Sequence, residues 1–362
     1  MSGELPATMR AAVLVERNRL EVQDRPVPRP GPGEVLVRVA MCGACGTDVS
    51  IQDHPFPHQP ALGEFIPGHE WTGTVAAVGE SVDEVAVGDR VAIHAHHGCG
   101  RCRNCLSGRY TACANYGNTE KGHRTPGFTV AGGFAEYVVH SIDAVYPLPD
   151  DASWEDAVLA VTAGTAMYGI DRAGGLVAGD HVVVIGPGPV GLMTVQVALA
   201  LGAASVTLVG TRANRLELGR TLGATATVNS RSVDPVAEVL RISGGRGADL
   251  VVETSGHPET PTQALQMCRR GGTALYLAFY DEEVPFDLGR ANREEITIVT
   301  ARGEGRLAVG RALALIGSGR VRGAELVTHR YGLEHIQQGF DDLRARVGDP
   351  MKMVVVPEGS LT

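Results

Sequence analysis

Four cysteines lie within one short segment of the chain, at positions Cys99, Cys102, Cys105 and Cys113. Thiolates at such spacing are typical of a closed tetrahedral zinc site, in which the metal holds the backbone together and does no catalysis. The alternative is four unligated cysteines that share a loop. We favour zinc, because cysteines clustered without a disulfide pattern indicate metal ligation and a reducing compartment. Since four sulfurs complete the tetrahedron, His94, His96 and His97 are expected on the surface or around the site.

A second group of metal-ligating residue types stands earlier in the chain. Cys45 is followed by Thr47 and Asp48, and His69 is followed by Glu70. A thiolate, an imidazole and a neighbouring carboxylate suit an open zinc site, where one position remains for water or substrate. Each residue alone also has an ordinary structural explanation, as part of a turn or as a hydrogen-bonded polar group. The combination predicts a catalytic metal site.

A glycine-rich segment follows the apolar run Val182–Ile185 and precedes an apolar, helix-compatible run that ends at Leu201. The segment reads Gly186, Pro187, Gly188, Pro189, Val190 and Gly191. A buried strand, G-x-G-x-x-G and a helix form the dinucleotide fingerprint, in which the glycines allow a tight turn, close approach of a pyrophosphate and close packing. The helix N-terminus offers free amides and a positive dipole end to phosphates. These patterns predict nucleotide binding.

The residue that decides between NAD and NADP as cofactor is expected directly after the next strand, Ser205–Val209. NAD-binding proteins place an acidic residue there, whereas this chain has Gly210, followed by Thr211 and Arg212. A missing carboxylate relieves repulsion of a 2′-phosphate, and the Arg212 guanidinium, assisted by Arg215, can bind that group. The alternative is a surface arginine at a helix start. We favour NADP over NAD, and expect an aspartate at position 210 to move the preference toward NADH.

The composition suits an enzyme of two domains. The chain has 362 residues, which is too long for one ordinary domain, and 44% of them are hydrophobic. A net charge of −9 argues against nucleic acid or an anionic membrane as partner. No apolar run approaches the roughly 18 residues of a membrane span, and no signal-peptide pattern opens the chain. We therefore expect a cytoplasmic protein that binds small molecules.

Short strands separated by Pro/Gly turns are predicted in the first 150 residues, at Met9–Val15, Leu20–Gln23, Glu34–Ala40, Thr72–Val78, Arg90–Ile93 and Phe134–Val139. A capping-box pattern at Ser153–Asp156 then begins a long helix-compatible stretch. Six later strands are predicted at Val182–Ile185, Ser205–Val209, Ala226–Val228, Asp249–Glu253, Thr273–Ala278 and Ile296–Thr300. Helices are predicted between them at Arg212–Leu222, Val233–Ser243 and Pro258–Arg270. This alternation predicts a doubly wound parallel sheet.

Five motifs occur in the order and at the spacing of one known family: Cys45-Gly46-Thr47-Asp48, Gly68-His69-Glu70, the four cysteines, Gly132–Tyr137 and Gly186–Gly191. The chain resembles the zinc-dependent medium-chain dehydrogenases, and its sequence pattern is most similar to that of the polyol (sorbitol), butanediol and threonine dehydrogenases. The resemblance implies an α/β protein with a GroES-like catalytic domain in residues 1–160, a Rossmann nucleotide-binding domain in 161–303, and a return to the catalytic domain in 304–362. It also implies a homodimer or homotetramer.

The resemblance further implies roles for the second group of residues. Cys45 and His69 would be zinc ligands, Glu70 would lie beside the metal, Thr47 would relay the proton, and Asp48 would orient His69. One departure concerns the third ligand, which family members carry as Glu, Asp or Cys in the helix that enters the second domain.

The family pattern places that third ligand on Val161, or on Thr162 after a slip of one residue. Neither side chain is a usual zinc ligand. The catalytic metal is then held by Cys45, His69 and Glu70, bound weakly, or absent.

The sequence therefore predicts an NAD(P)-linked dehydrogenase that interconverts a secondary alcohol, of polyol, sugar-like or aminocyclitol type, and its ketone. One alternative is a reductase of the same fold without catalytic zinc, acting on a carbonyl or an activated double bond. The other is a nucleotide-binding protein without turnover. A pure binding protein has no need for the second group of metal-ligating residue types, so its presence favours an enzyme.

Overall fold

The computed structural model describes residues 5–357, so the outer ends of the predicted ranges 1–160 and 304–362 lie outside it. The chain divides into two compact units. Within the described residues, unit 1 contains 5–161, 303–317 and 323–357, and unit 2 contains 162–302 and 318–322. Unit 1 is thus built from residues on both sides of unit 2 in the chain.

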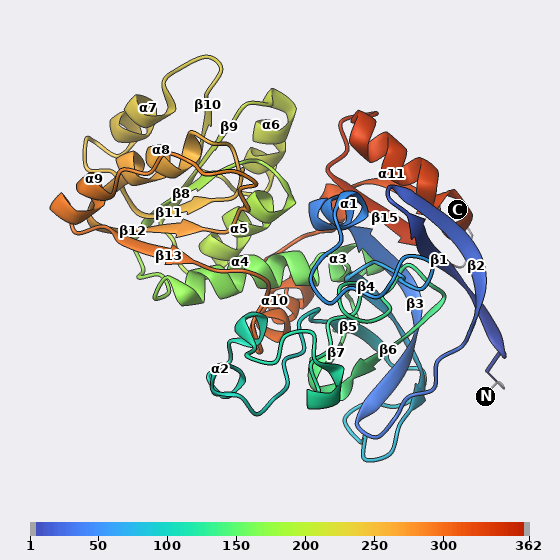
Figure 1. Cartoon of the computed structure of the whole chain (residues 1–362). Helices are drawn as coiled ribbons and strands as arrows, with labels where there is room; N and C mark the ends of the chain where they lie inside the picture. The colour runs from blue at the N-terminus through green and yellow to red at the C-terminus, as the bar shows by residue number, and fades with distance from the viewer. Residues whose placement is uncertain (1–4, 358–362) are drawn as a thin grey trace. The chain divides into compact units, whose positions relative to one another are not determined.

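Unit 2 is organised around a six-stranded sheet in which all neighbouring strands are parallel. Its strands are β8 (His181–Ile185), β9 (Ser205–Gly210), β10 (Ala226–Asn229), β11 (Ala248–Glu253), β12 (Cys268–Tyr276) and β13 (Thr297–Thr300). Their order is β10-β9-β8-β11-β12-β13, as in doubly wound nucleotide-binding folds, and Figure 1 shows them side by side. The predicted fold class is confirmed.

Six helices accompany this sheet: α4 (Ala160–Arg172), α5 (Pro189–Ala200), α6 (Ala213–Thr221), α7 (Pro235–Ile242), α8 (Thr260–Met267) and α9 (Leu288–Arg293). Helix α4 begins in unit 1 and continues into unit 2. The predicted helix Pro258–Arg270 is too long, because α8 ends at Met267 and β12 begins at once. Cys268 pairs there with Ala248 of β11, so strand pairing overrides the helical pattern.

Unit 1 holds a seven-stranded sheet and a separate antiparallel hairpin. The strands are β1 (Thr8–Glu16), β2 (Arg19–Pro26), β3 (Glu34–Ala44), β4 (Glu70–Val78), β5 (Arg90–Ile93), β6 (Tyr137–Ser141), β7 (Val145–Pro147), β14 (Val327–Gly332) and β15 (Lys352–Val356). The sheet order is β14-β15-β3-β4-β5-β7, with β6 also paired to β3. The last strand within residues 5–357, β15, therefore pairs with β3, which lies in the first 50 residues.

The helices of unit 1 are α1 (Gly46–Asp53), α2 (Arg103–Leu106), α3 (Trp154–Ala157), α10 (Ala308–Gly317) and α11 (Ile336–Ala345). The predicted helix start at Ser153 is confirmed, since Ser153 Oγ accepts a hydrogen bond from Asp156 N at 3.0 Å. Helix α1 was not predicted. It begins directly after Cys45, and Asp48 closes its first turn by accepting a hydrogen bond from Cys45 N at 2.9 Å.

The three histidines near the cysteines are expected on the surface or around the zinc site, and the structure excludes the surface for two of them. His94 and His96 are buried, and His97 is half-buried. His94 Nδ1 lies 3.0 Å from the Tyr146 hydroxyl, and burial lowers the pKa of His94 to about 3, so its ring is neutral. Nothing near them in the sequence indicates this burial, because residues from other elements cover them.

Glu304, at the start of the returning segment, is one of these residues and is only 1% exposed. Its carboxylate accepts hydrogen bonds from the amides of Ala95 and His96 and lies 3.3 Å from His96 Nδ1. Burial alone would raise the pKa of Glu304, but His96 and His94 lower it from 4.5 to about 2. The ionised carboxylate thus fixes the returning segment to the chain that precedes the cysteines.

We expect Glu304→Gln to lower the free energy of unfolding at pH 7 by about 1.5–3 kcal/mol, because hydrogen bonds to a buried charge are lost. A carboxyl whose pKa falls from 4.5 to about 2 on folding contributes stability above pH 4.5 and loses it as the pH falls through about 2. The gap between wild type and variant should therefore shrink below pH 4.5. Trp71 and Trp154, the two tryptophans of the chain, both lie in unit 1, so their fluorescence during urea unfolding reports on it.

The control is Glu155→Gln, which removes a carboxylate from a partly exposed ion pair with Arg330 at 3.4 Å. Such a pair contributes about 0–1 kcal/mol, so this variant should unfold close to the wild type. Equal effects of the two substitutions would show that Glu304 has no special role.

Candidate functional site

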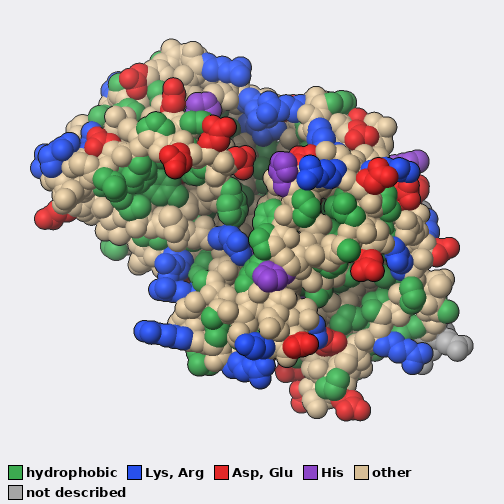
Figure 2. Space-filling model, viewed as in Figure 1, with side chains coloured by type: hydrophobic (Ala, Val, Ile, Leu, Met, Phe, Trp, Pro, Cys, Tyr) green, Lys and Arg blue, Asp and Glu red, His purple; other side chains and the backbone are tan. Residues whose placement is uncertain are grey.

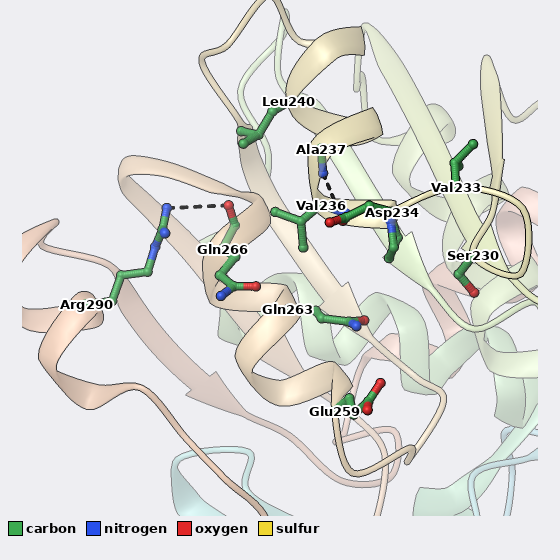
Figure 3. A pocket seen from close by; sticks show the side chains of 11 residues that line it. Ser230, Val233, Asp234, Val236, Ala237, Leu240, Glu259, Gln263, Gln266 and Arg290 are labelled. Atoms are coloured by element: carbon green, nitrogen blue, oxygen red, sulfur yellow. Dashed lines mark hydrogen bonds between the residues drawn. The ribbon is translucent and has the colours of Figure 1, made fainter.

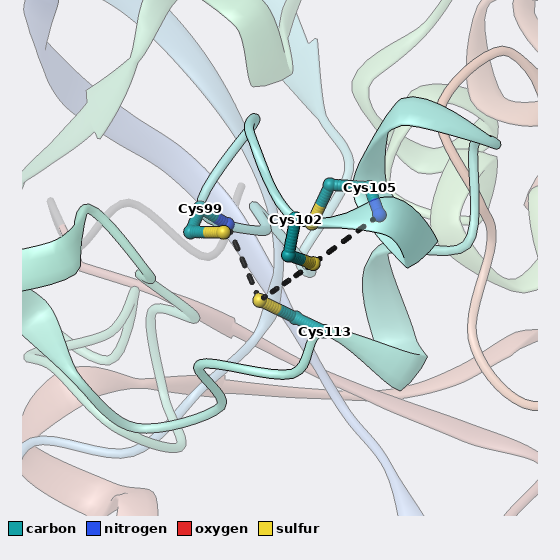
Figure 4. A group of neighbouring side chains, drawn as sticks. All are labelled: Cys99, Cys102, Cys105 and Cys113. Carbon is teal, nitrogen blue, oxygen red and sulfur yellow. Dashed lines mark hydrogen bonds between the residues drawn. The ribbon is translucent and has the colours of Figure 1, made fainter.

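The four cysteines of the predicted structural zinc site lie together in unit 1. Their sulfur atoms are all within 4.8 Å of one another, and Figure 4 shows the four side chains turned into a common space. Four sulfurs at about 2.3 Å from one ion fit inside this group, so the donor set suits tetrahedral zinc. The seven cysteines of the chain are all free thiols.

Backbone and side-chain amides surround these sulfurs. Cys105 N donates to Cys102 Sγ at 3.5 Å, Cys99 N donates to Cys113 Sγ at 3.4 Å, and Asn115 Nδ2 donates to Cys99 Sγ at 3.1 Å. Burial opposes ionisation of Cys99, but hydrogen bonds from the Asn115 side chain and from the backbone amides of Arg101 and Cys102 outweigh it and lower its pKa to about 6. Donors aimed at sulfur favour the thiolate, which is the metal-binding form.

The second predicted group is also brought together. Ligand atoms of Cys45, His69 and Glu70 all lie within 4.8 Å of one another. Cys45 stands between β3 and α1, and His69 and Glu70 stand at the start of β4. The turn before them needs Gly68, which has φ +96° and whose Cβ would lie 2.8 Å from Phe134 N.

Asp48 lies behind the imidazole of this group and is completely buried. Its Oδ1 is 3.3 Å from His69 Nδ1, which leaves Nε2 available to a metal. Burial lowers the pKa of His69, but Asp48 and Cys45 outweigh it and raise that pKa well above its ordinary value. Since only neutral imidazole ligates a metal, binding of a metal here must release a proton. Thr47 Oγ1 lies 3.6 Å from Cys45 Sγ.

Lys352 is a member of the site that sequence reasoning missed. Its ammonium forms an ion pair with Glu70, and both side chains are almost completely buried. A Cβ at position 43 would lie 2.9 Å from Glu70 Oε2 and 3.0 Å from Lys352 Cε, so Gly43 leaves room for the pair. The one signal in the sequence is a single charge in the otherwise apolar run Met351–Val356.

Helix α4, which carries the position expected for the third zinc ligand, supplies no ligand there. Val161 is 5% exposed and packs into the apolar core of unit 1. Among residues 5–357, the His, Cys, Asp and Glu side chains here whose ligand atoms all lie within 4.8 Å of one another are those of Cys45, His69 and Glu70.

The predicted dinucleotide segment lies at the end of β8. Gly186 has φ +106°, and its amide donates to Val209 O at 2.9 Å. A Cβ on Gly191 would lie 1.9 Å from Gly186 O, which accounts for the third glycine. The first hydrogen bond of α5 runs from Leu192 N to Gly188 O at 2.9 Å. The amides of residues 190 and 191 therefore lie in the first turn, before the hydrogen bonds of the helix begin. Pro187 and Pro189 contribute no amide hydrogen to this turn.

The four residues of the predicted ribose site lie from the end of β9 to the first turn of α6. Gly210 is the last residue of β9 and is buried, and Thr211 is exposed. Arg212 is half-buried at the N-cap position of α6. Arg215 is only 7% exposed. The two arginines therefore stand at one helix start, but only Arg212 keeps substantial exposure.

A surface pocket of unit 2 lies between α7 and α8 (Figure 3). It is lined by Ser230, Val233, Asp234, Pro235, Val236, Ala237, Leu240, Glu259, Gln263, Gln266 and Arg290. None of the predicted site residues contributes to it, and Asp234 is occupied in capping α7. On the face shown in Figure 2, Lys and Arg are interspersed with Asp and Glu. No helix within residues 5–357 has the length and apolar character needed to span a membrane.

A doubly wound sheet with this glycine turn, together with two groups of metal-ligating side chains, is typical of nucleotide-dependent metal oxidoreductases. Two family models match the chain: the alcohol dehydrogenase GroES-like domain over residues 31–150, and the zinc-binding dehydrogenase domain over residues 189–318. The chain belongs to the zinc-type medium-chain dehydrogenase/reductase family. It is an oxidoreductase that acts on CH–OH groups.

Individual relatives agree with this assignment over nearly the whole chain. Sorbitol dehydrogenase of Bacillus subtilis is 33% identical over 361 residues, which covers 99% of each protein. A solved oxidoreductase/dehydrogenase of unknown specificity from Escherichia coli has a TM-score of 0.90 and 29% identity, covering 96% of this chain and 99% of its own. A Sinorhizobium meliloti 1021 protein solved with NADP bound has a TM-score of 0.86 and 29% identity, covering 97% and 100%.

We expect Cys102→Ser to remove one zinc per chain and to lower the thermal unfolding midpoint, because a structural zinc contributes directly to folding. Cofactor binding in unit 2 should persist. Zinc is measured by atomic emission on the purified protein, with Cys268→Ser as the control, since this buried cysteine lies in β12, outside both groups. Unchanged zinc in the Cys102 variant would contradict the assignment.

Proposed function

We propose that the chain is an NADP(H)-linked zinc dehydrogenase that interconverts a secondary alcohol and its ketone. The observation that carries this proposal is the group of Cys45, His69 and Glu70, in which His69 and Glu70 are buried, with Asp48 behind the imidazole. A thiolate, an imidazole and a carboxylate at this separation are a donor set that suits zinc. A second zinc would be held by the four cysteines.

The residues of the chain then have distinct tasks. When bound, zinc supplies a Lewis acid that lowers the pKa of the substrate hydroxyl, and the nicotinamide supplies the hydride acceptor. Thr47, whose hydroxyl lies 3.6 Å from Cys45 Sγ, takes the proton from the substrate oxygen and passes it outward. Asp48 fixes the ring of His69 with Nε2 toward the metal side. Lys352 neutralises Glu70 in the dry interior.

This site has no strong third zinc ligand. Val161 supplies none, and Glu70 is already paired with Lys352. A carboxylate has two oxygens, so pairing through Oε2 is compatible with ligation through Oε1. Zinc held by two strong ligands and a shared carboxylate should exchange readily. The apolar setting of Val161 also favours the second candidate, a reductase of the same fold that works without catalytic zinc.

We expect wild-type protein to hold two zinc ions per chain and to lose one of them to mild chelation. Glu70→Ala should reduce retention further, because it removes the third donor. Val161→Cys should increase retention, because a thiol is a zinc ligand that an apolar core accommodates. Zinc per chain is measured by atomic emission before and after chelation, alongside oxidation of a panel of secondary alcohols.

Val161→Ala is the matched control, since it alters packing without adding a donor. If both zinc ions of the wild type resist chelation, the third ligand has been misplaced. If the chain holds one zinc and its activity is unaffected by chelation, the metal-free reductase is the better proposal.

The NADP preference rests on the ribose site. The residue that ends β9 is Gly210, and the half-buried Arg212 stands at the start of α6, where its guanidinium can pair with a phosphate. The NADP-bound protein of Sinorhizobium meliloti, 29% identical to this chain, supports NADP as the cofactor. Arg215, being buried, would act by supporting this helix start.

We expect Arg212→Ala to weaken NADPH binding by about 1.5–3 kcal/mol, the range for hydrogen bonds to a charged group, and to leave NADH binding almost unchanged. Dissociation constants are measured by titration calorimetry. Arg220→Ala is the control, because Arg220 is exposed on the same helix and pairs with Glu217 at 2.8 Å. Tight NADH and negligible NADPH binding by the wild type would refute the preference.

Substrate and assembly follow as further parts of the proposal. Sorbitol dehydrogenase, the relative 33% identical over nearly the full chain, supports a polyol, sugar-like or aminocyclitol substrate. An oligomer, dimer or tetramer, is supported by β13, the last strand in the sheet order, in which Thr297, Ile298 and Thr300 are exposed. Pairing with a second copy would cover this edge. Reduced thiols fit the cytoplasm as the location.

A further inference from the structure

We infer that Pro187 is a specificity-determining residue for the cofactor. Its ring occupies the space that a side chain at position 210 would need, so the exclusion of a carboxylate from the ribose site depends on the glycine-rich turn as well as on β9. This inference rests on the proposed use of NADP, but it concerns a contact that can be tested whichever cofactor is bound.

The contact between the two residues is very close. A Cβ at position 210 would lie 2.4 Å from Pro187 Cδ and 2.5 Å from Pro187 Cγ. Leu216 Cδ2 lies 3.5 Å from the same point, on another side. Separations below 3.0 Å are essentially never seen for a Cβ, so one residue must shift. The proline ring cannot rotate away, because it is closed onto its own backbone nitrogen.

The backbone on the Pro187 side is held in place. Gly186 N donates to Val209 O at 2.9 Å, which ties the turn to β9. Thr254 Oγ1 donates to Gly186 O at 3.0 Å and to Ile185 O at 2.8 Å. With φ +106° at Gly186, the direction in which the proline ring leaves the turn is fixed.

The backbone on the Gly210 side is held as well. Gly210 O accepts hydrogen bonds from Ser230 N at 2.9 Å and from Ser230 Oγ at 3.3 Å. Gly210 also pairs in register with Asn229 of β10. The close approach is therefore fixed by hydrogen bonds on both flanks, and neither backbone can withdraw without breaking some of them.

On this inference, aspartate at position 210 alone would not move the preference toward NADH. A carboxylate recognises the ribose 2′-hydroxyl only if its side chain can leave the end of β9 in the ordinary way. Here that path meets the ring of Pro187. Gly210→Asp should instead distort the glycine-rich turn and weaken both cofactors.

The test is a double-mutant cycle on the full-length protein, with dissociation constants for NADH and NADPH measured for wild type, Gly210→Asp, Pro187→Ala and the double variant. We expect Gly210→Asp to weaken both cofactors about tenfold or more, and the double variant to bind NADH about tenfold more tightly than Gly210→Asp alone, as for residues in direct contact. NADPH binding should stay weak in the double variant. Combining Gly210→Asp with Pro189→Ala is the matched control and should give no such recovery.

Two results would overturn the inference. One is a Gly210→Asp variant that already prefers NADH as strongly as the double variant does. The other is additive behaviour of the two substitutions. If Gly210→Asp does not fold, as judged by its thermal midpoint, Gly210→Ala with and without Pro187→Ala tests the same contact with a single methyl group. A wild type that binds only NADH would refute the NADP proposal, while the cycle, measured with NADH, would still decide on Pro187.

Discussion

A lysine and a glutamate are buried together where three strands of unit 1 meet. Removing two ions from water costs several kcal/mol each, and only their mutual attraction and hydrogen bonding offset that cost. Lys352 and Glu70 meet across 282 positions of the sequence, with Gly43 of β3 leaving the space between them. The pair thereby fixes β15, β3 and the start of β4 relative to one another.

The candidate metal group inherits its geometry from this arrangement. Glu70 follows His69 directly, and Cys45 comes directly after β3, so the ends of the constrained strands carry the donors. Asp48, in the first turn of α1, then fixes the imidazole from behind. The same principle holds in unit 2, where the close contacts of Gly186, Gly191 and Gly210 leave one path for the turn after β8. In both units, glycines stand at positions where a side chain would collide with a neighbouring residue.

Much of the fold could be predicted because its signals are local. Alternating strands and helices predicted the doubly wound sheet, and closely spaced cysteines predicted the group around Cys102. Lys352, Glu304 and the contact of Pro187 with Gly210 could not be predicted, because their partners come from other elements. Glu304 pairs with His96 across 208 positions, and no periodicity encodes such a contact. The end of α8 was missed for the same reason, since pairing with β11 decides it.

The discontinuity of unit 1 affects the order in which the chain can fold during synthesis. Glu70 leaves the ribosome 282 residues before Lys352, and β3 appears long before its neighbour β15. Unit 2 consists of residues 162–302 and 318–322, so it is complete while the last strands of unit 1 are still missing. Domains generally fold as units as they emerge, N-terminal parts first. In this chain unit 2 is therefore expected to fold first, and a nascent chain that stops before Lys352 leaves Glu70 without its buried cation.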